Sequence, residues 1–372
     1  MKTRILFFIT SLAGGGAEKV LVNMVNHLSK EKYDITVQTL FDVGVNKQYL
    51  DSHVNYRSVY KRPVRGISRF FLFFNPSKLY KKMIHNSYDI VVSYFQGPTT
   101  RIVAACPYEQ TRIVQWVHNE FHEKKKIARC YRSLNECIKL QRRFNATIYV
   151  AESVRDIYLH TFPEIKGNDI VLYNVVESDK IQSMAEESID SKEVLFSGQV
   201  NLISVGRFVQ QKAFDRLIRI TSRLIASGYD VKLLLLGSGA LESQLKKLVK
   251  ELGMSSYVEF LGYQTNPYKY VNNADLFVCS SLHEGFSTAV TESLIVGTPV
   301  ITTECSGMYE LLGNNEYGII VDNDEEALFE GIKRIVSNPE TLMMLKDQAK
   351  KRGSFFKLEE TVEAIESFFD SL

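Results

Sequence analysis

The sequence predicts an α/β protein built from two Rossmann-like, doubly wound parallel-sheet domains that face each other across a cleft. A chain of 372 residues is long enough for two domains with separate hydrophobic cores. Short apolar runs rich in β-branched residues alternate with helical patterns, as parallel strands covered by helices on both faces do. These runs are too numerous for one ordinary open sheet but divide into two similar sets.

The predicted strands divide at a polar segment. In the first half they are residues 5–10, 35–41, 90–95, 112–118, 147–151 and 170–176, and in the second half 202–208, 231–239, 258–263, 276–281, 299–305 and 318–322. Residues 178–198 are acidic and lack a sustained apolar stripe, which predicts a linker. We therefore expect an N-terminal domain at 1–177, a C-terminal domain at 199–355, and a closing helix at 356–372 that packs back on the N-terminal domain.

The N-terminus, MKTRILFFITSLAGGGAEKV, admits two interpretations. Lys2 and Arg4 before a short apolar run, with small residues near Ala17, are typical of a secretory signal peptide. The same residues also fit a buried strand, a glycine turn and the start of an amphipathic helix. Cleavage would discard the strand that this helix is built to cover, so we favour the strand and expect no export. The apolar positions on one face of that helix are Val20, Leu21, Met24, Val25 and Leu28.

Composition indicates a soluble globular protein in a reducing compartment. Apolar residues make up 45% of the chain and charged residues 24%, and no run approaches the roughly 18 apolar residues of a membrane span. A net charge of +2 does not suggest a nucleic-acid partner. Five cysteines without a C-x-x-C pair argue against a disulfide framework or a zinc site.

The first chemistry-bearing stretch is the glycine loop SLAGGGAEK at residues 11–19. Consecutive glycines, including Gly15 and Gly16, let backbone N–H groups approach a ligand at a helix N-terminus. Lys19 breaks the G-x-G-x-x-G dinucleotide pattern, and the loop is not a Walker A motif. The alternative is a flexible turn with no ligand.

The second half contains a pair of cations at a predicted strand end. VGRFVQQKAFDRLI places Arg207 and Lys212 at the carboxyl edge of a parallel sheet, where a diphosphate could be held. Two solvated surface charges are the alternative. A further strand, glycine turn and helix at 233–248 reach the same edge.

Two carboxylates follow in SSLHEGFSTAVTESLIVGTPV. Glu284 lies in a loop, and Glu292 lies in the first turn of a helix that we expect to start near Ala289. Glu292 could simply complement the helix dipole. Glu284 has less structural reason to be there, and a carboxylate in such a loop can accept hydrogen bonds from sugar hydroxyls.

Together these motifs resemble those of family 4 retaining glycosyltransferases of the GT-B fold, of the kind found in bacterial capsule and exopolysaccharide synthesis. The matching segments are GGGAEKV (14–20), YNVVE (173–177), VGRF-x4-K (205–212), GSGxL (237–241) and E-G-F-x6-E (284–292). Each is weak alone, but five in the family's order along nearly the whole chain are specific.

The resemblance implies roles for these residues. Arg207 and Lys212 would bind the diphosphate of a nucleotide sugar and stabilise the leaving group. Glu292 would hold the ribose and Glu284 the donor sugar, with the N-terminal domain binding the acceptor. Residues implied to bind substrate or nucleotide also include Gly15, Gly16, Gly237, Gly262, Gly285, Phe286, Ser287 and Thr288.

Three further positions complete this interpretation. His118, after a predicted strand, matches the place where the family keeps a histidine near the sugar, although a histidine there can also be an ordinary hydrogen-bonded residue. Ala213 replaces the glycine that usually follows the lysine. The Asp322–Asp324 triplet looks like a metal-binding D-x-D, but it follows a late strand and is better explained as a turn. Because two cations already offer charge neutralisation, we expect no metal and no cofactor.

The predicted function is transfer of a hexosyl or N-acetylhexosaminyl unit from a nucleotide sugar, with UDP favoured, to a lipid-linked saccharide. Two alternatives remain open here: an NAD-dependent oxidoreductase on tandem Rossmann domains, and a catalytically silent partner subunit of a glycosyltransferase. The first lacks the G-x-G-x-x-G motif, and the second predicts loss of residues that are present.

Charge distribution predicts where the protein works. Residues 61–83 contain seven Lys or Arg residues and no acidic residue, and residues 124–143 contain eight against one Glu. Basic residues interleaved with aromatics suit an anionic membrane surface. We expect a cytoplasmic protein bound peripherally to the inner face of the membrane. RNA could fit the same composition, but no nucleic-acid module accompanies it; a solvated helix face with aromatics in the core is the third possibility.

Overall fold

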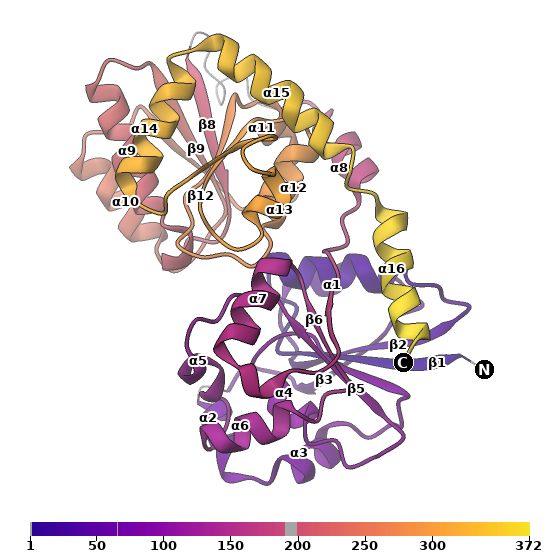
Figure 1. The fold of residues 1–372 in the computed structure, drawn as a ribbon. Helices are drawn as coiled ribbons and strands as arrows, with labels where there is room; N and C mark the ends of the chain where they lie inside the picture. Colours follow the sequence, from indigo (N-terminus) through magenta and orange to yellow (C-terminus); the bar gives the residue numbers. More distant parts are fainter. Residues whose placement is uncertain (1, 65, 190–198) are drawn as a thin grey trace. The chain divides into compact units, whose positions relative to one another are not determined.

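The computed structural model describes residues 2–64, 66–189 and 199–372. The chain forms two compact units, each with its own parallel sheet (Figure 1). The first unit comprises Met1–Val176 and Leu358–Leu372, and the second comprises Glu177–Lys357. This is the predicted pair of doubly wound α/β domains.

The first unit contains a seven-stranded parallel sheet in the order β3-β2-β1-β4-β5-β6-β7. Its strands are β1 Thr3–Ile9, β2 Tyr33–Phe41, β3 Asn55–Tyr60, β4 Ile90–Ser93, β5 Arg112–Val117, β6 Ala146–Tyr149 and β7 Asp169–Val171. Ile5 pairs with Ile35 on one side and Ile90 on the other, so the strand order reverses at β1. Ligands of open α/β sheets bind at the carboxyl edge near such a reversal.

Helices cover both faces of this sheet because alternate residues of β1 are buried on opposite sides (Figure 1). Leu6 and Phe8 belong to a core cluster with residues of α3 and α4, whereas the Phe7 ring meets Phe369 of α16 at 6.0 Å between centroids. The helices of this unit are α1 Gly16–His27, α2 Ile67–Phe70, α3 Pro76–Met83, α4 Pro98–Val103, α5 Lys124–Ala128, α6 Leu134–Gln141, α7 Glu152–Thr161 and α16 Leu358–Asp370, with 3-10 turns η1 Val45–Tyr49, η2 Phe71–Phe73 and η3 Pro163–Ile165.

The second unit contains a six-stranded parallel sheet in the order β10-β9-β8-β11-β12-β13. Its strands are β8 Val200–Val205, β9 Val231–Leu236, β10 Val258–Gly262, β11 Leu276–Cys279, β12 Val300–Thr303 and β13 Ile319–Val321. Its helices are α8 Ser178–Ala185, α9 Phe214–Ala226, α10 Glu242–Glu251, α11 Tyr268–Asn273, α12 Thr288–Ile295, α13 Met308–Leu312, α14 Glu325–Val336 and α15 Pro339–Gly353, with the 3-10 turn η4 Gln210–Lys212.

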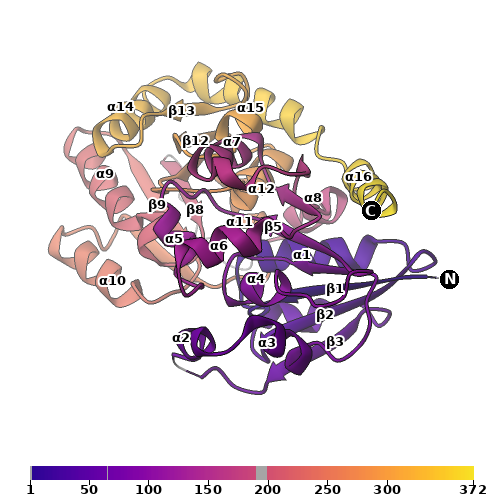
Figure 2. The ribbon, with the colours of Figure 1, turned by 60° about the horizontal axis from the view of Figure 1, so that its bottom comes forward.

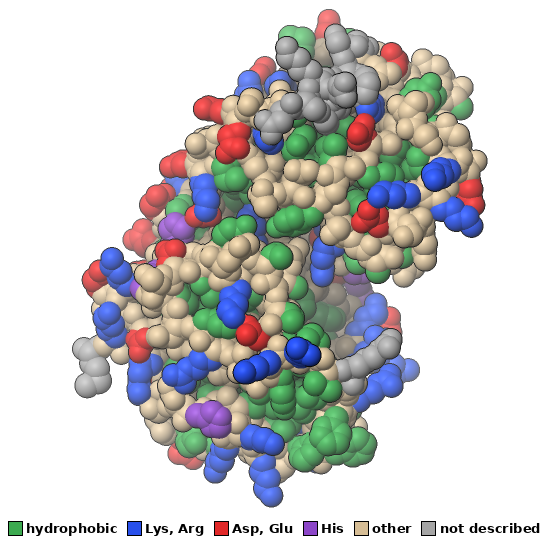
Figure 3. All heavy atoms as spheres, turned by 180° about the vertical axis from the view of Figure 1, so that it is seen from behind, with side chains coloured by type: hydrophobic (Ala, Val, Ile, Leu, Met, Phe, Trp, Pro, Cys, Tyr) green, Lys and Arg blue, Asp and Glu red, His purple; other side chains and the backbone are tan. Residues whose placement is uncertain are grey.

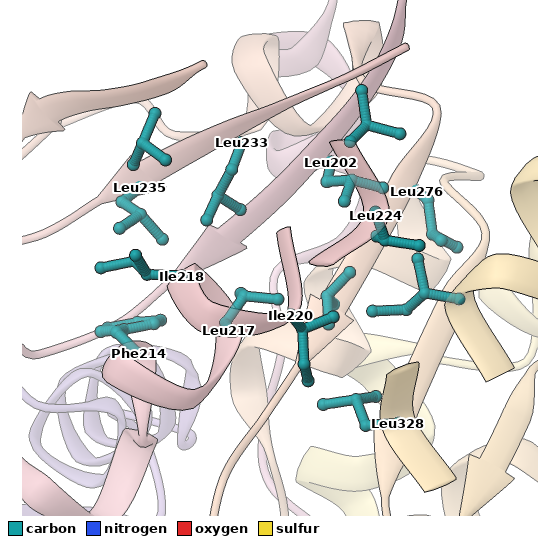
Figure 4. Packing of buried hydrophobic residues seen from close by; sticks show 14 of the residues in the cluster. Leu202, Phe214, Leu217, Ile218, Ile220, Leu224, Leu233, Leu235, Leu276 and Leu328 are labelled. Carbon is teal, nitrogen blue, oxygen red and sulfur yellow. The ribbon is translucent and has the colours of Figure 1, made fainter. Parts of the chain in front are cut away.

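Strand β9 explains why this sheet is covered on both faces. Leu233 and Leu235 join the core cluster to which α9 contributes Leu217 and Ile218 (Figure 4). The intervening Leu234 lies in the cluster on the other face, with residues of α11 to α13. A run of consecutive leucines therefore fills two cores at once, as expected for a buried parallel strand.

The closing helix α16 packs on the first unit, as the sequence predicts. Besides the Phe7–Phe369 contact, the Tyr33 hydroxyl donates to Asp370 Oδ1 at 2.6 Å, and the Ser29 backbone N–H donates to Glu366 Oε1 at 2.7 Å. These contacts join residues more than three hundred positions apart, so the two chain ends share one core.

The expected linker differs from the structure in its first part. Residues 178–185 form helix α8 of the second unit, where Asn266 Nδ2 donates to the Met184 carbonyl at 2.7 Å. The reason is a short apolar stripe, Ile181 and Ala185, that buries one helical face despite the acidic composition. Residues 190–198 lie outside the described residues.

Two other expectations needed correction. Strand β3 was missed because its residues are only half-buried and form no apolar run. The last predicted strand of the first half is shorter, ending at Val171. In the part of the chain that the structure describes, no helix has the length and apolar character needed to cross a bilayer.

We predict that Phe369→Ala lowers the free energy of unfolding of the protein by about 3–5 kcal/mol, because a buried aromatic ring is replaced by a cavity between α16 and the first sheet. Urea unfolding measures the change. Met343→Ala, at an exposed position on α15, is the matched control and should stay within about 0.5 kcal/mol of the wild type. Equal effects of the two variants would contradict the packing of α16.

Candidate functional site

Loops at the carboxyl ends of β8, β9 and β10 lie close together in the second unit because glycines allow it. A Cβ atom on Gly237 would lie 1.9 Å from the Gly206 carbonyl oxygen, and Gly237 has a φ of +135°. The Gly237 N–H donates to the Gly262 carbonyl at 2.8 Å, and the Phe208 N–H donates to the Ser238 carbonyl at 2.9 Å. Gly237, in the loop after β9, and Gly262, the last residue of β10, are both predicted site residues and are joined by the first of these hydrogen bonds.

The charged centre of this edge is an ion pair between Lys212 and Glu284. Lys212 Nζ lies 2.6 Å from Glu284 Oε1, and the Ser281 hydroxyl donates to the same oxygen at 2.6 Å. Glu284 is only 7% exposed. A buried carboxylate is tolerated because two donors compensate it.

Lys212 stays protonated in this environment. Burial lowers the pKa of its ammonium group, but the Glu284 carboxylate outweighs that effect and the pKa is raised. The Lys212 side chain lies against the backbone next to Arg207, since a Cβ on Gly206 would lie 3.3 Å from Lys212 Cε, and the guanidinium of Arg207 acts on the Lys212 pKa in the opposite direction. Arg207 is exposed and, among the described residues, has no ion-pair partner. Two neighbouring cations, only one of which is paired with a carboxylate, can accept a dianionic ligand.

Backbone hydrogen bonds hold the loop of Lys212 against the loop of Glu284. The Leu282 N–H donates to the Gln211 carbonyl at 2.8 Å, and Ser280 Oγ donates to the Lys212 carbonyl at 2.9 Å. The turn η4 ends at Ala213, which adopts the left-handed conformation with φ 46° and ψ 44°. This conformation explains why glycine is usual at the position, since an alanine there is strained.

A pair that the sequence analysis missed, Asn323 and buried Arg216, ties these loops to the loop before α14. The Arg216 guanidinium donates to Asn323 Oδ1 at 3.1 Å and to the Ser280 and Ser281 carbonyls. Asn323 Nδ2 in turn donates to the Leu282 carbonyl at 2.9 Å. Burial lowers the pKa of Arg216. A charged residue on the otherwise apolar face of α9 was the available signal.

The D-x-D-like triplet is occupied by structural contacts. Asn323 belongs to the loop network, and Asp324 caps α14 by accepting from the Ala327 N–H at 2.8 Å. Within the described ranges, no three His, Cys, Asp or Glu side chains are grouped as a metal site requires.

Helix α12 presents the remaining predicted residues of the second unit. It begins at Thr288, and Ser287 is its N-cap, accepting from the Val290 N–H at 3.4 Å. Glu292 therefore lies in the second turn rather than the first, because the cap falls earlier than the sequence suggested. Tyr268 of α11 donates its hydroxyl to Glu292 Oε1 at 3.3 Å, which orients the carboxylate.

Gly285 and Phe286 connect Glu284 to this helix. The loop after β12 comes so close that a Cβ on Gly307 would lie 2.5 Å from the Gly285 carbonyl oxygen and 3.2 Å from Phe286 Cα. The N–H groups at the start of α12, which have no partner within the helix, follow directly. Such a helix start favours an anion.

The other predicted residues lie in the first unit. Gly15 is the N-cap of α1 and Gly16 its first residue. The glycine loop is fixed by the neighbouring turn, where the Asn46 N–H donates to the Leu12 carbonyl at 3.1 Å. A Cβ on Gly15 would clash with the carboxylate of Glu18. Burial raises the pKa of the Tyr94 hydroxyl, and the negative charge of Glu18 raises it further.

His118 lies beside Tyr94 at the end of β5. The two rings are 4.5 Å apart between centroids, and His118 is 7% exposed. Burial lowers the pKa of His118 to about 3, and a hydrogen bond to the Tyr94 backbone only partly opposes this. Nε2 is buried without a partner among the described residues. The imidazole is therefore neutral at physiological pH, and with Nδ1–H on the Tyr94 carbonyl its Nε2 can accept a hydrogen bond from a ligand hydroxyl.

The chain matches two family models that together span most of its length. Residues 14–180 match the model described as "Glycosyltransferase Family 4", and residues 185–352 match "Glycosyl transferases group 1".

Relatives and solved structures agree with these matches. A Campylobacter jejuni N-acetylgalactosamine-N,N'-diacetylbacillosaminyl-diphospho-undecaprenol 4-alpha-N-acetylgalactosaminyltransferase is 28% identical over 94% of both chains. The Staphylococcus aureus capsular polysaccharide biosynthesis glycosyltransferase CapM is 29% identical over 40% of both. The structure of Anabaena HepE in complex with UDP has a TM-score of 0.78 at 18% identity and covers all of both chains. At that identity the structural likeness shows the fold alone.

We predict that Gly237→Ala destabilises the protein by about 3 kcal/mol, since the new methyl group meets the Gly206 carbonyl in addition to the backbone strain. Gly228→Ala is the matched control: its φ is also positive, at +88°, but a Cβ there meets nothing within 4 Å. Gly228→Ala should lower the free energy of unfolding by about 1 kcal/mol. Equal losses in urea unfolding would show that the close approach of the two loops is unimportant.

The lowered pKa of His118 predicts a pH dependence of stability. A buried neutral histidine stabilises the fold fully above its unfolded pKa of 6.5, and this stability is lost as the pH falls from 6.5 towards 3. At pH 5 the loss should be about 2 kcal/mol. In plots of the free energy of unfolding against pH, His118→Phe should remove this decrease between pH 6.5 and 3, whereas His122→Phe, at an exposed position, should keep it. Parallel slopes for the wild type and His118→Phe would contradict the assignment.

Proposed function

The chain belongs to the family 4 glycosyltransferases of the GT-B fold, and on that premise we propose that it transfers a hexosyl or N-acetylhexosaminyl unit, with retention, from a UDP-sugar to a lipid-linked saccharide. The observation that carries the proposal is the ion pair of half-buried Lys212 with buried Glu284, next to Arg207 at the carboxyl edge of the second sheet. Cell-surface polysaccharide synthesis is the setting that the capsule and undecaprenol-linked relatives support.

The two cations would bind the diphosphate. An ammonium group has three donors, so Lys212 can keep its bond to Glu284 and still donate to a phosphate oxygen. Negative charge grows on the diphosphate as the glycosidic bond breaks, and fixed cations stabilise that charge more in the transition state than in the ground state. The proposal assigns this charge stabilisation to Lys212 and Arg207 and requires no metal ion and no cofactor.

The loop and helix after Glu284 would hold the rest of the donor. The backbone N–H groups of Phe286 to Thr288 lie at the start of α12, where an anion is favoured. Glu292, oriented by Tyr268, would accept hydrogen bonds from the ribose hydroxyls. The second oxygen of Glu284 is assigned to a hydroxyl of the donor sugar.

The first unit would bind the acceptor and contribute His118. Its neutral Nε2 would accept a hydrogen bond from a sugar hydroxyl, and the Gly15–Gly16 turn is proposed to contact the acceptor saccharide. Glu284 Oε1 is already bonded to Lys212 and Ser281, which makes this carboxylate a poor nucleophile. We therefore favour attack from the leaving-group face over a covalent intermediate. A lipid-linked acceptor implies a cytoplasmic protein at the inner face of the membrane.

Family membership sets aside the oxidoreductase alternative. The silent-subunit alternative is disfavoured because it predicts loss of the ligand set, whereas Arg207, Lys212, Glu284 and Glu292 are all present in the chain.

A thermal-shift screen of the protein with UDP, GDP, ADP and NAD tests the proposal. UDP should raise the melting temperature most, equally with magnesium and with EDTA, and Glu292→Gln should reduce the shift. The matched control is Glu340→Gln, at an exposed position on α15. Stabilisation by NAD, or a UDP effect that needs magnesium, would contradict the proposed donor site.

We predict that Lys212→Met lowers turnover about 10²–10³-fold and also destabilises the protein by about 3 kcal/mol, because Glu284 is left buried without its cation. The double variant Lys212→Met with Glu284→Gln removes both charges. It should recover most of the stability and none of the turnover, measured by urea unfolding and by UDP release. If turnover returned with stability, Lys212 would be structural rather than catalytic.

A further inference from the structure

Three exposed phenylalanines form a protrusion on the first unit. Phe70 ends α2, Phe73 ends η2 and Phe74 follows it; their side chains are 57%, 80% and 43% exposed. Their rings touch one another: the Phe70 centroid lies 5.0 Å from that of Phe74 and 6.5 Å from that of Phe73. In Figure 1 and Figure 2, α2 lies at the periphery of the unit. We call residues 70–74 the aromatic turn. Single exposed apolar residues are common, but a contiguous group marks an interaction surface.

Two arginines satisfy the backbone of the aromatic turn. Buried Arg101 donates to the Phe71 carbonyl at 3.0 Å and the Phe74 carbonyl at 3.3 Å. Arg132 donates to the Leu72 carbonyl at 2.5 Å and the Phe73 carbonyl at 3.1 Å.

One carboxylate, Glu136, positions both arginines. Its side chain pairs with the Arg101 guanidinium at 2.8 Å and accepts the Arg132 backbone N–H at 2.6 Å. Four consecutive carbonyls of a surface turn thus have protein donors. Backbone carbonyls that enter an apolar environment need hydrogen-bond donors from the protein, whereas carbonyls exposed to water can be hydrated instead.

Exposed cationic residues flank the aromatic turn in the sequence. Arg69 on α2 is exposed, and α3 buries Leu79, Tyr80 and Met83 while its three lysines, Lys78, Lys81 and Lys82, face solvent. Residues 61–83 contain no acidic side chain. In Figure 3, hydrophobic side chains gather at the lower right of the first unit with Lys and Arg side chains nearby.

We propose that the aromatic turn is a membrane-docking wedge. Its three phenylalanine rings enter the boundary between headgroups and acyl chains of an anionic bilayer, and the lysines of α3 with Arg69 bind the lipid phosphates. The side chains of residues 70–74 offer no hydrogen-bonding group to a base edge, and the carbonyls of residues 71–74 are already bonded within the protein, which favours an apolar lipid phase over RNA. The wedge does not depend on the identity of the sugar donor.

Tryptophan fluorescence tests insertion directly. The wild type has one tryptophan, Trp116, which is 2% exposed and gives a constant background. Phe73→Trp is the reporter, and Met343→Trp, at a 70% exposed position on α15, is the matched control. With phosphatidylglycerol vesicles containing brominated acyl chains, Phe73→Trp should shift to the blue and be quenched, and Met343→Trp should not. Absence of quenching at position 73, or equal quenching at both positions, would overturn the proposal.

A binding experiment separates lipid from other partners. Phe70→Ser/Phe73→Ser/Phe74→Ser should weaken co-sedimentation with phosphatidylglycerol vesicles roughly tenfold or more, whereas Met343→Ser/Met344→Ser should not. Phosphatidylcholine vesicles and high salt should both reduce binding of the wild type. An unchanged UDP thermal shift in the triple variant shows that it is folded and keeps the donor-site question separate. Wild-type vesicle binding by the triple variant would overturn the proposal, as would binding to RNA but not to vesicles.

Discussion

The ion pair between half-buried Lys212 and buried Glu284 is the interaction on which the second unit's site depends. Charges inside a protein are tolerated only when they are paired and hydrogen-bonded, so the two loops that carry them must be held in register. The loop network does this: η4 is bonded to the loop after β11, and Arg216 with Asn323 fastens that loop to the start of α14. A cation fixed in advance at a sheet edge costs little reorganisation when a diphosphate binds, which is the physical basis of electrostatic catalysis.

Both sheets are buried on their two faces, and this determines where a site can form. Helices on each side leave the carboxyl edge as the place where loops and polar groups can gather, and glycines such as Gly237 let those loops approach to backbone contact. The first unit also has a sheet covered on both faces, but the residues at its carboxyl edge are of a different kind. Its edge holds a glycine turn and a neutral histidine, His118, rather than cations, which suits uncharged sugar hydroxyls more than phosphate.

Much of this was predictable from the sequence, for identifiable reasons. Buried parallel strands are continuous apolar runs, so their order along the chain could be inferred, and Lys212 and Glu284 could be nominated because each lies in the loop that follows such a run. The half-exposed strand β3 and helix α8 carry weaker patterns and were missed. Arg216 and Asn323 are 107 positions apart, and only the folded chain brings them together. That Glu284 is bonded to Lys212, and that His118 is neutral, likewise depend on burial that local sequence does not reveal.

Calorimetric titration with UDP and with uridine, in EDTA, tests most directly whether the paired cations hold a diphosphate. The wild type should bind UDP about a hundredfold more tightly than uridine, and Arg207→Met should lose most of that difference while leaving uridine binding unchanged, because charge-assisted contacts to phosphate oxygens would account for it. Arg207 is exposed, so its loss should not disturb the fold. Equal affinity for UDP and uridine in the wild type, or a preference that Arg207→Met leaves intact, would contradict the account.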